Sequence, residues 1–404
     1  MSTARIAAIG KVIRGVSWDK DDASDSPRAD YMPILRAGNI GNELNTESDL
    51  VWVPASNVSN EQKIRAGDIA ICMSSGSPTV VGKTASAVSD WPGSVGAFCA
   101  LIRANPEKCL PEYLAFFLKS ERFRSWTSEA QGANIKNIKK SALEDFDIWV
   151  PPLPEQRRIV DLLSRADGIV RLRREAEKKA AELIPALFLD MFGDPATNPK
   201  GWVRTELGTL LDSIDSGHSP KCHSQQKQPH QWGVLKLSAL SGGLYREEEH
   251  KTLPKEISPD TTVEVRSGDV LLSRKNTYEL VGTAAYVRKT IGRILLPDLI
   301  FRLNITDSER LNPVYLWGLL SMNAKREQIR KLASGSAGSM PNISKARLKT
   351  LEIELPPHQD QIRFSLSVEQ IRSIQSQQST ATAKAQATFD ALLAQAFHFT
   401  ESMA

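Results

Sequence analysis

The side chains best suited to binding chemistry lie in polar loops, and the segment at 273–278 is the clearest of these loops. It reads Ser-Arg-Lys-Asn-Thr-Tyr and so places two cations, an amide and an aromatic ring next to one another. Arginine and asparagine read base edges through paired hydrogen bonds, and lysine contacts phosphates. Because a cationic, aromatic-tipped loop is costly to place anywhere but in solvent or against a polyanion, Arg274, Lys275, Asn276 and Tyr278 are predicted to contact nucleic acid.

Polar side chains of the same kinds recur in three loop regions of each half of the chain. The first region follows an early strand, the second follows a Gly-Asp turn and its strand, and the third precedes a closing strand. Two assignments leave alternatives open, since Arg36 could pair with an acid of its own module and Lys139 could simply be solvated. Besides the 273–278 loop, the predicted DNA contacts are Arg36, Asn39, Lys236, Ser75, Ser77, Lys83, Asn134, Lys136, Lys139, Ser339, Lys345 and Arg347.

Two short motifs suggest nucleotide binding or catalysis, but their surroundings support neither. Gly-Lys-Thr at 82–84 lacks the earlier glycine of a phosphate-binding loop, because position 77 is a serine. Asn-Pro-Val-Tyr at 312–315 resembles the tetrapeptide with which amino-methyltransferases hold a flipped base, yet the matching segment at 110–113 reads Leu-Pro-Glu-Tyr. The sequence also contains no Gly-x-Gly cofactor loop. We therefore expect no catalytic residue and no cofactor bound by this chain.

A metal site is equally poorly supported. His218, Cys222, His223 and His230 are close in sequence, but the paired cysteine spacing of a structural zinc site is missing and the segment is rich in glutamine and proline. A solvated loop explains it better. The four cysteines show no paired spacing, no run of 18 apolar residues could span a membrane, and the N-terminus lacks the pattern of a secretory signal. These features favour a cytoplasmic protein.

The elements that position the loops are duplicated. KIRAGDIAICMSS at 63–75 returns as EVRSGDVLLSRKN at 264–276, PEYLAFFL at 111–118 as PVYLWGLL at 313–320, and NIKKSALEDFDIWVPP at 137–152 as NISKARLKTLEIELPP at 342–357. The separation of matching residues rises along the three segments from 201 to 205, whereas chance matches would scatter. The chain is therefore predicted to hold two copies of one module.

Each module reads as a β-rich domain followed by a long helix. Met32–Leu35, Ile69–Met73 and Phe98–Arg103 are predicted strands, Pro111 and Pro313 start helices, and alternating apolar residues at 146–150 and 351–355 indicate closing strands. Helices are expected from about Glu155 to Phe192 and from about Asp360 to Phe397. Their seam residues alternate in steps of three and four: Ile159, Leu162, Ala166, Ile169, Arg173, Ala176, Ala180, Leu183 and Leu187, with copies 205 positions later.

This pattern predicts an α+β fold in which two β-rich domains are each followed by a long helix, the two helices pairing as an antiparallel coiled coil. Pro185 is expected to kink or interrupt the first helix. Such a molecule could contact two separated sites on a rod such as duplex DNA. The net charge is only +4, and the basic excess lies in residues 193–355. Composition therefore leaves open a second class of protein, a coiled-coil scaffold with two protein-binding heads.

Three segments together resemble the specificity subunit of type I restriction–modification systems. They are LPEQRRIVDLL at 153–163 after two prolines, the pair RAGDIAI and RSGDVLL, and Asn-Pro-Lys-Gly-Trp at 198–202. The resemblance covers essentially the whole chain, including the duplication. It departs from the family at His358, Gln359 and Asp360, which stand where Leu153, Pro154 and Glu155 stand in the first copy.

The resemblance implies a non-catalytic DNA reader. Target-recognition domains would occupy residues 1–152 and 194–355, with conserved spacer helices at 153–193 and 356–404. Each domain would read one half of a bipartite, asymmetric target. Two modification subunits would carry the S-adenosylmethionine-dependent adenine methylation, and two restriction subunits that use ATP and Mg²⁺ could join them. The residues expected to bind these partners are Glu155, Gln156, Arg157, Arg158, Gln361 and Arg363.

Overall fold

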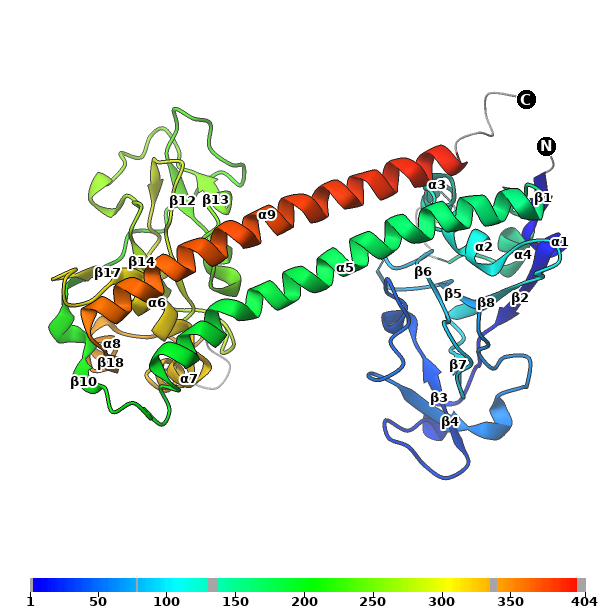
Figure 1. Cartoon of the computed structure of the whole chain (residues 1–404), viewed down its shortest axis with the longest axis horizontal. Helices are drawn as coiled ribbons and strands as arrows, with labels where there is room; N and C mark the ends of the chain where they lie inside the picture. The colour runs from blue at the N-terminus through cyan, green and yellow to red at the C-terminus, as the bar shows by residue number, and fades with distance from the viewer. Residues whose placement is uncertain (1–2, 78, 130–136, 335–339, 398–404) are drawn as a thin grey trace. The chain divides into compact units, whose positions relative to one another are not determined.

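The chain folds as two compact units that each combine one half of the sequence with part of the other. The computed structural model describes residues 3–77, 79–129, 137–334 and 340–397. Unit 1 comprises Met1–Arg174 and Thr380–Ala404, and unit 2 comprises Glu175–Ser379 (Figure 1). Each unit therefore contains a β-rich domain, the beginning of the long helix that follows it and the end of the other long helix.

Unit 1 contains two main sheets and a short strand pair. The four-stranded antiparallel sheet has the order β2-β8-β5-β6, the three-stranded sheet the order β4-β3-β7, and β1 pairs with β9. The strands are β1 (Thr3–Arg5), β2 (Gly10–Arg14), β3 (Tyr31–Leu35), β4 (Val51–Pro54), β5 (Ile69–Cys72), β6 (Thr84–Ser86), β7 (Ser94–Val95), β8 (Cys99–Ala104) and β9 (Asp147–Trp149). The short helices are α1 (Ile6–Ile9), α2 (Pro111–Phe117), α3 (Glu121–Glu129) and α4 (Lys140–Glu144), with 3₁₀ turns at Lys20–Asp22, Ala37–Asn39 and Ala55–Asn57.

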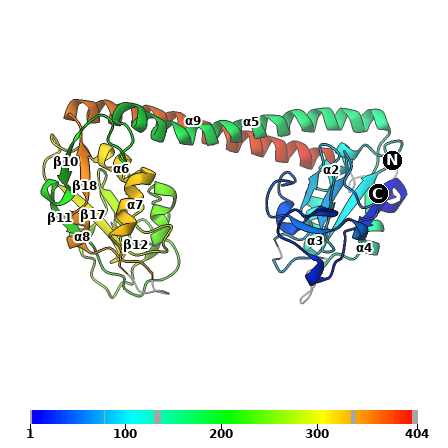
Figure 2. The ribbon, with the colours of Figure 1, turned by 90° about the horizontal axis from the view of Figure 1, so that it is seen from below.

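Unit 2 repeats this architecture strand for strand. Its sheets have the orders β11-β17-β14-β15 and β13-β12-β16, and β10 pairs with β18 (Figure 2). The strands are β10 (Val203–Glu206), β11 (Leu211–Asp215), β12 (Gly233–Leu235), β13 (His250–Thr252), β14 (Val270–Ser273), β15 (Ala284–Tyr286), β16 (Ile294–Leu295), β17 (Ile300–Ile305) and β18 (Glu352–Leu355). The helices are α6 (Pro313–Ser321), α7 (Asn323–Lys331) and α8 (Lys345–Lys349), with 3₁₀ turns at Leu207–Leu210, Leu237–Gly243 and Thr261–Val263.

The Gly-Asp turn that leads into the central strand of each unit has a structural reason. Gly67 adopts a φ of +83°, which favours glycine, and the backbone N–H of Arg65 donates to the Asp68 carboxylate at 2.8 Å. That carboxylate then accepts two hydrogen bonds of 2.7 Å from Arg103 on β8. The turn thus ties β5 to β8 through a buried charge pair, because Asp68 is only 1% exposed.

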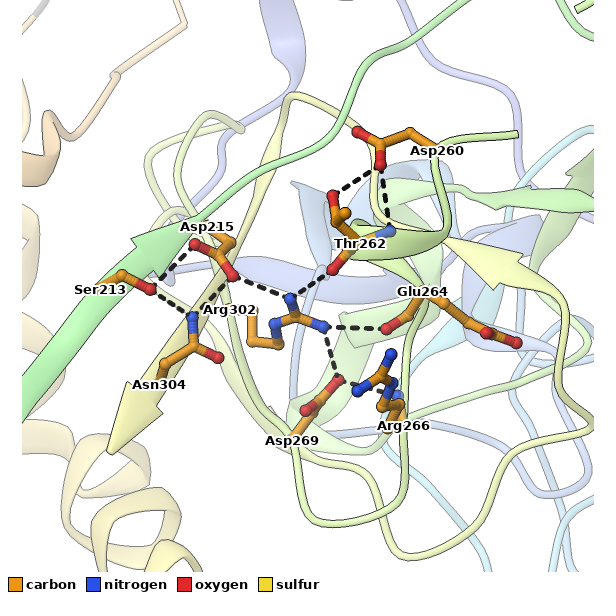
Figure 3. A network of polar contacts seen from close by, with 9 residues as sticks. All are labelled: Ser213, Asp215, Asp260, Thr262, Glu264, Arg266, Asp269, Arg302 and Asn304. Carbon is orange, nitrogen blue, oxygen red and sulfur yellow. Dashed lines mark hydrogen bonds and ion pairs between the residues drawn. The ribbon is translucent and has the colours of Figure 1, made fainter. Parts of the chain in front are cut away.

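Unit 2 has the equivalent contact between the Gly-Asp turn and an arginine of β17, and this arginine has more partners. The Arg266 N–H donates to the Asp269 carboxylate at 2.8 Å, and the Arg302 guanidinium lies 3.7 Å from the same carboxylate. Figure 3 shows Arg302 at the centre of this network, where it also pairs with Asp215 of β11 at 2.8 Å. Burial raises the pKa of Asp269. Burial has the same tendency at Asp215, but hydrogen bonds from Arg302, Asn304 and Ser213 outweigh it and lower the pKa of that carboxyl.

The two long helices were predicted with the correct type and nearly correct ends. Helix α5 spans Leu153–Phe192 and α9 spans His358–Phe397. Within unit 1 the end of α9 lies against the β-rich domain, with Phe397 edge-on to Tyr113 at 5.5 Å (Figures 1 and 2). Within unit 2 the end of α5 takes the equivalent place, with Phe192 edge-on to Tyr315 at 4.9 Å.

The helices run antiparallel to each other in both units. In unit 1 the Arg174 guanidinium donates to Gln386 at 2.8 Å, and residues near Leu162 share a groove with residues near Leu392. In unit 2 Gln375 donates to the carbonyl of Ala180 at 2.6 Å. The predicted antiparallel pairing is therefore confirmed.

Two details of the helix prediction differ from the structure. Helix α5 continues through Pro185, so the proline does not interrupt it. The buried face matches the predicted seam only in part, because Ile159 and Ala180 are buried as predicted but Leu163, Val170 and Ile184 are buried as well. Their predicted neighbours Leu162, Ile169 and Leu183 are 45%, 52% and 45% exposed. A seam assigned from spacing alone cannot show that each helix must also cover a β-rich domain.

Among the described residues, no helix is long and apolar enough to cross a membrane.

Candidate nucleic-acid interface

The 273–278 loop of unit 2 lies directly beside the start of α8. Lys275 forms a β-bridge with Asn342, and the N–H of Ile343 donates to the carbonyl of Arg274 at 2.8 Å. These backbone contacts join the second and third predicted loop regions, which are separated by about 70 residues in sequence. The structure therefore brings Arg274, Lys275 and Lys345 together, as a shared binding surface requires.

The cations of this surface are held in place by an aromatic ring. Arg274 lies 5.0 Å and Lys345 5.9 Å from the centre of the buried Phe301 ring on β17. Arg274 Nε also donates to the Asn342 side chain at 3.1 Å. Because both contacts fix the guanidinium without neutralising it, the positive charge stays available to a phosphate or a guanine edge.

The tip of the same loop presents an aromatic side chain. Tyr278 is 56% exposed, and the Arg330 guanidinium of α7 lies 5.5 Å from its ring centre. Lys275 is exposed, while Asn276 is half-buried and its side-chain oxygen accepts from the N–H of Thr277 at 2.9 Å. Arg347 is exposed and donates to the carbonyl of Leu332 at 3.3 Å. The loop thus combines fixed cations with an exposed ring.

Unit 1 places its corresponding loops side by side in the same way, with different side chains. Ser74 forms a bridge with Asn137, and the N–H of Ile138 donates to the carbonyl of Met73 at 2.8 Å. Lys83 and Lys139 are both exposed near these loops in sequence, and Ser77 is exposed and shares a hydrogen bond with Thr79 at 3.0 Å. Ser75 is half-buried, with its hydroxyl accepting from the N–H of Ser77 at 3.2 Å.

Phe98, which was not among the predicted site residues, is an exposed aromatic residue whose backbone lies beside the serine loop of unit 1. Its carbonyl accepts hydrogen bonds from the N–H groups of Met73 and Ser74 at 2.8 and 3.0 Å, so it lies beside the serine loop. The side chain is 70% exposed. The only sequence signal was its place just before β8, at the position matched by Leu299 in unit 2.

In the loop after the early strand, the side chain of one predicted contact is used within the loop itself. Asn39 is 2% exposed, because its side chain accepts from the N–H of Arg36 and donates to the carbonyls of Asn45 and Ser48. It therefore holds its own loop together. Arg36 is exposed and donates a hydrogen bond to the backbone carbonyl of Asp49 at 3.2 Å. This partner is a backbone group and not the acidic side chain that the sequence left open.

Lys236, the matching residue of unit 2, is half-buried and paired with Glu249 at 3.6 Å. Asn134, Lys136 and Ser339 lie outside the described residues.

Two of the predicted partner-binding residues are buried anchors. Gln156 is fully buried; its side chain accepts from the N–H of Leu110 at 2.8 Å and donates to the carbonyls of Lys108 and Pro151. Gln361 is fully buried as well and repeats the pattern, accepting from Asn312 at 2.8 Å and donating to Arg310 and Pro356. The expectation that these glutamines contact a partner was wrong, because their hydrogen-bonding groups bind the start of each long helix to its own domain.

The other predicted partner-binding residues are exposed or half-buried. Arg158 pairs with Glu155 at 2.7 Å, Arg363 pairs with Asp360 at 3.4 Å, and Arg157 is exposed. In the folded chain the Arg158 hydrogen bond is the main cause that lowers the pKa of Glu155. These surface pairs contribute little to stability.

Exposed apolar side chains on the long helices were not predicted as a binding surface. In unit 1 they are Leu162, Ile169 and Leu172 on α5, which are 45%, 52% and 62% exposed. In unit 2, Ile362, Leu366 and Ile374 on α9 are 40%, 63% and 49% exposed. Apolar side chains in rows on a helix are typical of a surface that another helix covers.

The motifs set aside in the sequence have structural explanations. Asn312 caps α6 by accepting from the N–H groups of Val314 and Tyr315 at 2.9 and 3.3 Å. Gly82 and Lys83 form a turn, with their N–H groups donating to the carbonyls of Cys72 and Val80. In the described part of the chain, no cluster of three or more histidine, cysteine or acidic residues could hold a metal ion.

Comparison with known proteins decides the family. Residues 3–182 match the model of the type I restriction modification DNA specificity domain. The EcoKI specificity subunit of Escherichia coli K12 is 30% identical over 98% of this chain and 88% of its own length. The chain belongs to the specificity subunits of type I restriction enzymes. The StySPI specificity subunit of Salmonella potsdam is similar at 29% identity, with the same coverage of both chains.

Solved structures agree on the fold. A chain from a study of complex assembly and conformational transition of the type I R-M system matches with a TM-score of 0.56 and 21% identity, covering 98% of this chain and 97% of that one. The specificity subunit from M. genitalium matches with a TM-score of 0.53 and 13% identity, covering 98% and 96%. These structures show the fold. The family match shows that this chain is the DNA specificity subunit of a type I restriction–modification system, in which catalysis belongs to the partner subunits.

Proposed function

We propose that this specificity subunit reads a bipartite, asymmetric target on double-stranded DNA, one half with each unit. Target-recognition domains at residues 1–152 and 194–355, with spacer helices at 153–193 and 356–404, are part of this proposal. The observation that carries it is the contrast between a duplicated frame and diverged loops. Arg103 and Arg302 repeat the frame contact, whereas the serine loop of unit 1 corresponds to the cationic 273–278 loop of unit 2. Different side chains at equivalent loops would select different bases.

The proposed DNA contacts differ in kind between the units. In unit 2, Arg274 and Lys345 lie against the Phe301 ring, Lys275, Asn276 and Tyr278 belong to the same loop as Arg274, and Arg347 lies with Lys345 on helix α8. In unit 1, Ser75 and Ser77 offer hydroxyl groups beside Phe98, with Lys83 and Lys139 as phosphate contacts. Arg36 and Lys236 stay secondary candidates because each already has a partner within its unit.

We further propose that two modification subunits dock on the long helices and supply adenine methylation with S-adenosylmethionine, and that two restriction subunits using ATP and Mg²⁺ can join them. The exposed apolar residues of α5 and α9 support such docking, with Arg157, Arg158 and Arg363 at the helix starts as polar contacts. A cytoplasmic location belongs to the same proposal and fits four unpaired cysteines.

The experiment that tests this function is DNA binding by the assembled modification complex. Methylated adenines mapped in cells that express this chain with its modification partner should define a motif with two different halves and a fixed gap. Binding to that motif should weaken steeply as salt rises, because each phosphate contact releases counterions. A continuous motif, or binding that does not respond to salt, would contradict the proposal and favour a protein-binding scaffold.

A further inference from the structure

A cavity of about 500 Å³ lies within unit 2, between the β-rich domain and the paired segments of α5 and α9. Ile184 and Phe188 line it from α5, Trp317 from α6, Met322 from the turn before α7, Arg326 from α7 and Arg372 from α9. Its size falls within the range of about 300–1,000 Å³ that is usual for small-molecule sites. Helix pairing and DNA reading do not require a space of this kind.

The duplicated frame itself does not create this cavity. At the matching place in unit 1, the rings of Phe116 and Phe389 are both buried and lie 6.3 Å apart. Unit 2 has Gly318 and Ile184 at the equivalent positions, so the side chains that fill this place differ between the units. A Cβ atom at Gly318 would lie 2.8 Å from the Phe364 ring, so this position has no room for a side chain. The Phe364 ring occupies the room beside Gly318, so the smaller side chain that borders the cavity is Ile184, where unit 1 has Phe389.

Two arginines that line the cavity lack an acidic partner. Arg326 donates to the carbonyl of Glu279 and the hydroxyl of Thr283, and its buried Nε has no partner. The Arg372 guanidinium lies 4.8 Å from the centre of the Trp317 ring. Within the described part of the chain, neither guanidinium has a carboxylate within 4.0 Å, although Glu177 also belongs to the lining.

The acids whose charges act on these arginines are already paired elsewhere. Glu369, which is near Arg372, forms an ion pair with Arg288, and Glu327, which is near Arg326, forms one with Arg330. Arg326 and Arg372 are both half-buried, and this partial burial lowers the pKa of each guanidinium. An anion in the cavity would offset the cost of partly removing these two charges from water.

We propose that this cavity binds a small organic anion with a flat apolar body and one carboxylate, sulfonate or phosphate group. The anionic group pairs with Arg326 and Arg372, and the apolar body packs between Trp317, Phe188 and Met322. A bound anion stabilises unit 2 by mass action, since it contacts α5, α6, α7 and α9 together only when they are folded. This inference is independent of the proposed DNA target.

The test uses two probes with the same kind of apolar body. We expect 8-anilinonaphthalene-1-sulfonate to bind the full chain at one saturable site in isothermal titration calorimetry, and N-phenyl-1-naphthylamine, which lacks the sulfonate, to bind at least tenfold more weakly. Equal affinity for the two probes, or no binding of the sulfonate, overturns the proposal. This comparison needs no variant and so does not depend on the folding of one.

Two variants locate the site. Arg372→Met should raise the Kd of the sulfonate at least tenfold and leave that of the uncharged probe unchanged. Ile184→Phe restores the ring that unit 1 has at this position and should abolish binding of both probes. The matched control Arg363→Met removes an exposed arginine from the same helix and should leave the Kd unchanged. Sulfonate binding that survives both variants belongs to another surface and contradicts the inference.

Discussion

Helices α3 and α7 occupy equivalent places in the two units, yet the same buried position holds an aromatic ring in one and a charge in the other. Phe123 in unit 1 is fully buried, 5.5 Å from both Trp126 and Phe146. Lys325 in unit 2 is 1% exposed, forms an ion pair with the Glu354 carboxylate at 2.9 Å and donates a hydrogen bond to the Glu352 carbonyl at 2.9 Å. By contrast, the Gln156 and Gln361 anchors are unchanged. The buried side chains of the two units have diverged, whereas the glutamine contacts that hold each long helix to its domain are the same.

Removal of the buried Lys325 cation should have the largest effect on the stability of unit 2. Lys325→Met should lower the free energy of unfolding of unit 2 by about 3 kcal/mol, because it leaves Glu354 with only the half-exposed Arg204 as a charged partner. Amide hydrogen exchange of α7 and β18 measures this loss directly. The double variant Lys325→Met/Glu354→Leu should recover most of the stability, since an apolar pair resembles the arrangement in unit 1. Faster exchange in the double variant than in the single one would contradict this account.

Removal of the buried glutamine should destabilise both units to the same extent. Gln156→Leu and Gln361→Leu each leave one N–H group and two carbonyls buried without a partner, so each should cost about 2 kcal/mol. Hydrogen exchange at the start of α5 and of α9 reports the two losses separately. Gln370→Leu, an exposed glutamine on α9, serves as the control and should change nothing. A large effect in one unit and none in the other would show that the frames are not equivalent.

These anchors also show what the sequence could and could not predict. The sequence predicted both long helices, both closing strands and β3, β5 and β8 with ends correct to about two residues, because these depend on local patterns. It did not predict short strands such as β4, β6 and β7, which span two to four residues. It did not predict that Gln156 and Asn39 are buried, since their partners lie in other segments that spacing does not reveal. The buried face of α5 was only partly predicted for the same reason.

The candidate site was predictable to a similar degree. Residue types placed the cationic surface in the 273–278 loop, and the fold brings that loop beside Lys345. Phe98 was missed because a single exposed ring has no periodic signal; only the hydrogen bonds to its carbonyl place it beside Ser74.

Variants of the loop surfaces should each weaken recognition of only one half of the DNA target. Arg274→Ala should weaken specific binding of the assembled complex about tenfold, because a guanine or phosphate contact of unit 2 is lost. Competition with oligonucleotides altered in one half-site at fixed salt identifies the half affected. Unchanged affinity and unchanged site preference would remove Arg274 from the interface.

The smallest expected effect is that of the exposed ring in unit 1. Phe98→Ala should weaken binding by about 1 kcal/mol, through loss of an apolar contact with a base such as the thymine methyl group. The change should concern the half-site that Arg274→Ala leaves intact. Val88→Ala, at an apolar side chain that is 96% exposed, is the matched control. Equal losses of DNA affinity for Phe98→Ala and Val88→Ala would contradict a specific contact of Phe98 with the DNA.

The most direct test of the central claim exchanges loops between the units. The segment at 274–279, Arg-Lys-Asn-Thr-Tyr-Glu, is replaced by its unit 1 counterpart at 73–79, Met-Ser-Ser-Gly-Ser-Pro-Thr, and methylated adenines are mapped in cells that also express the modification subunit. If a common frame carries independent reading loops, one half of the motif changes while the other half and the gap between them stay the same. A motif that stays intact, or one that changes in both halves, would contradict this account.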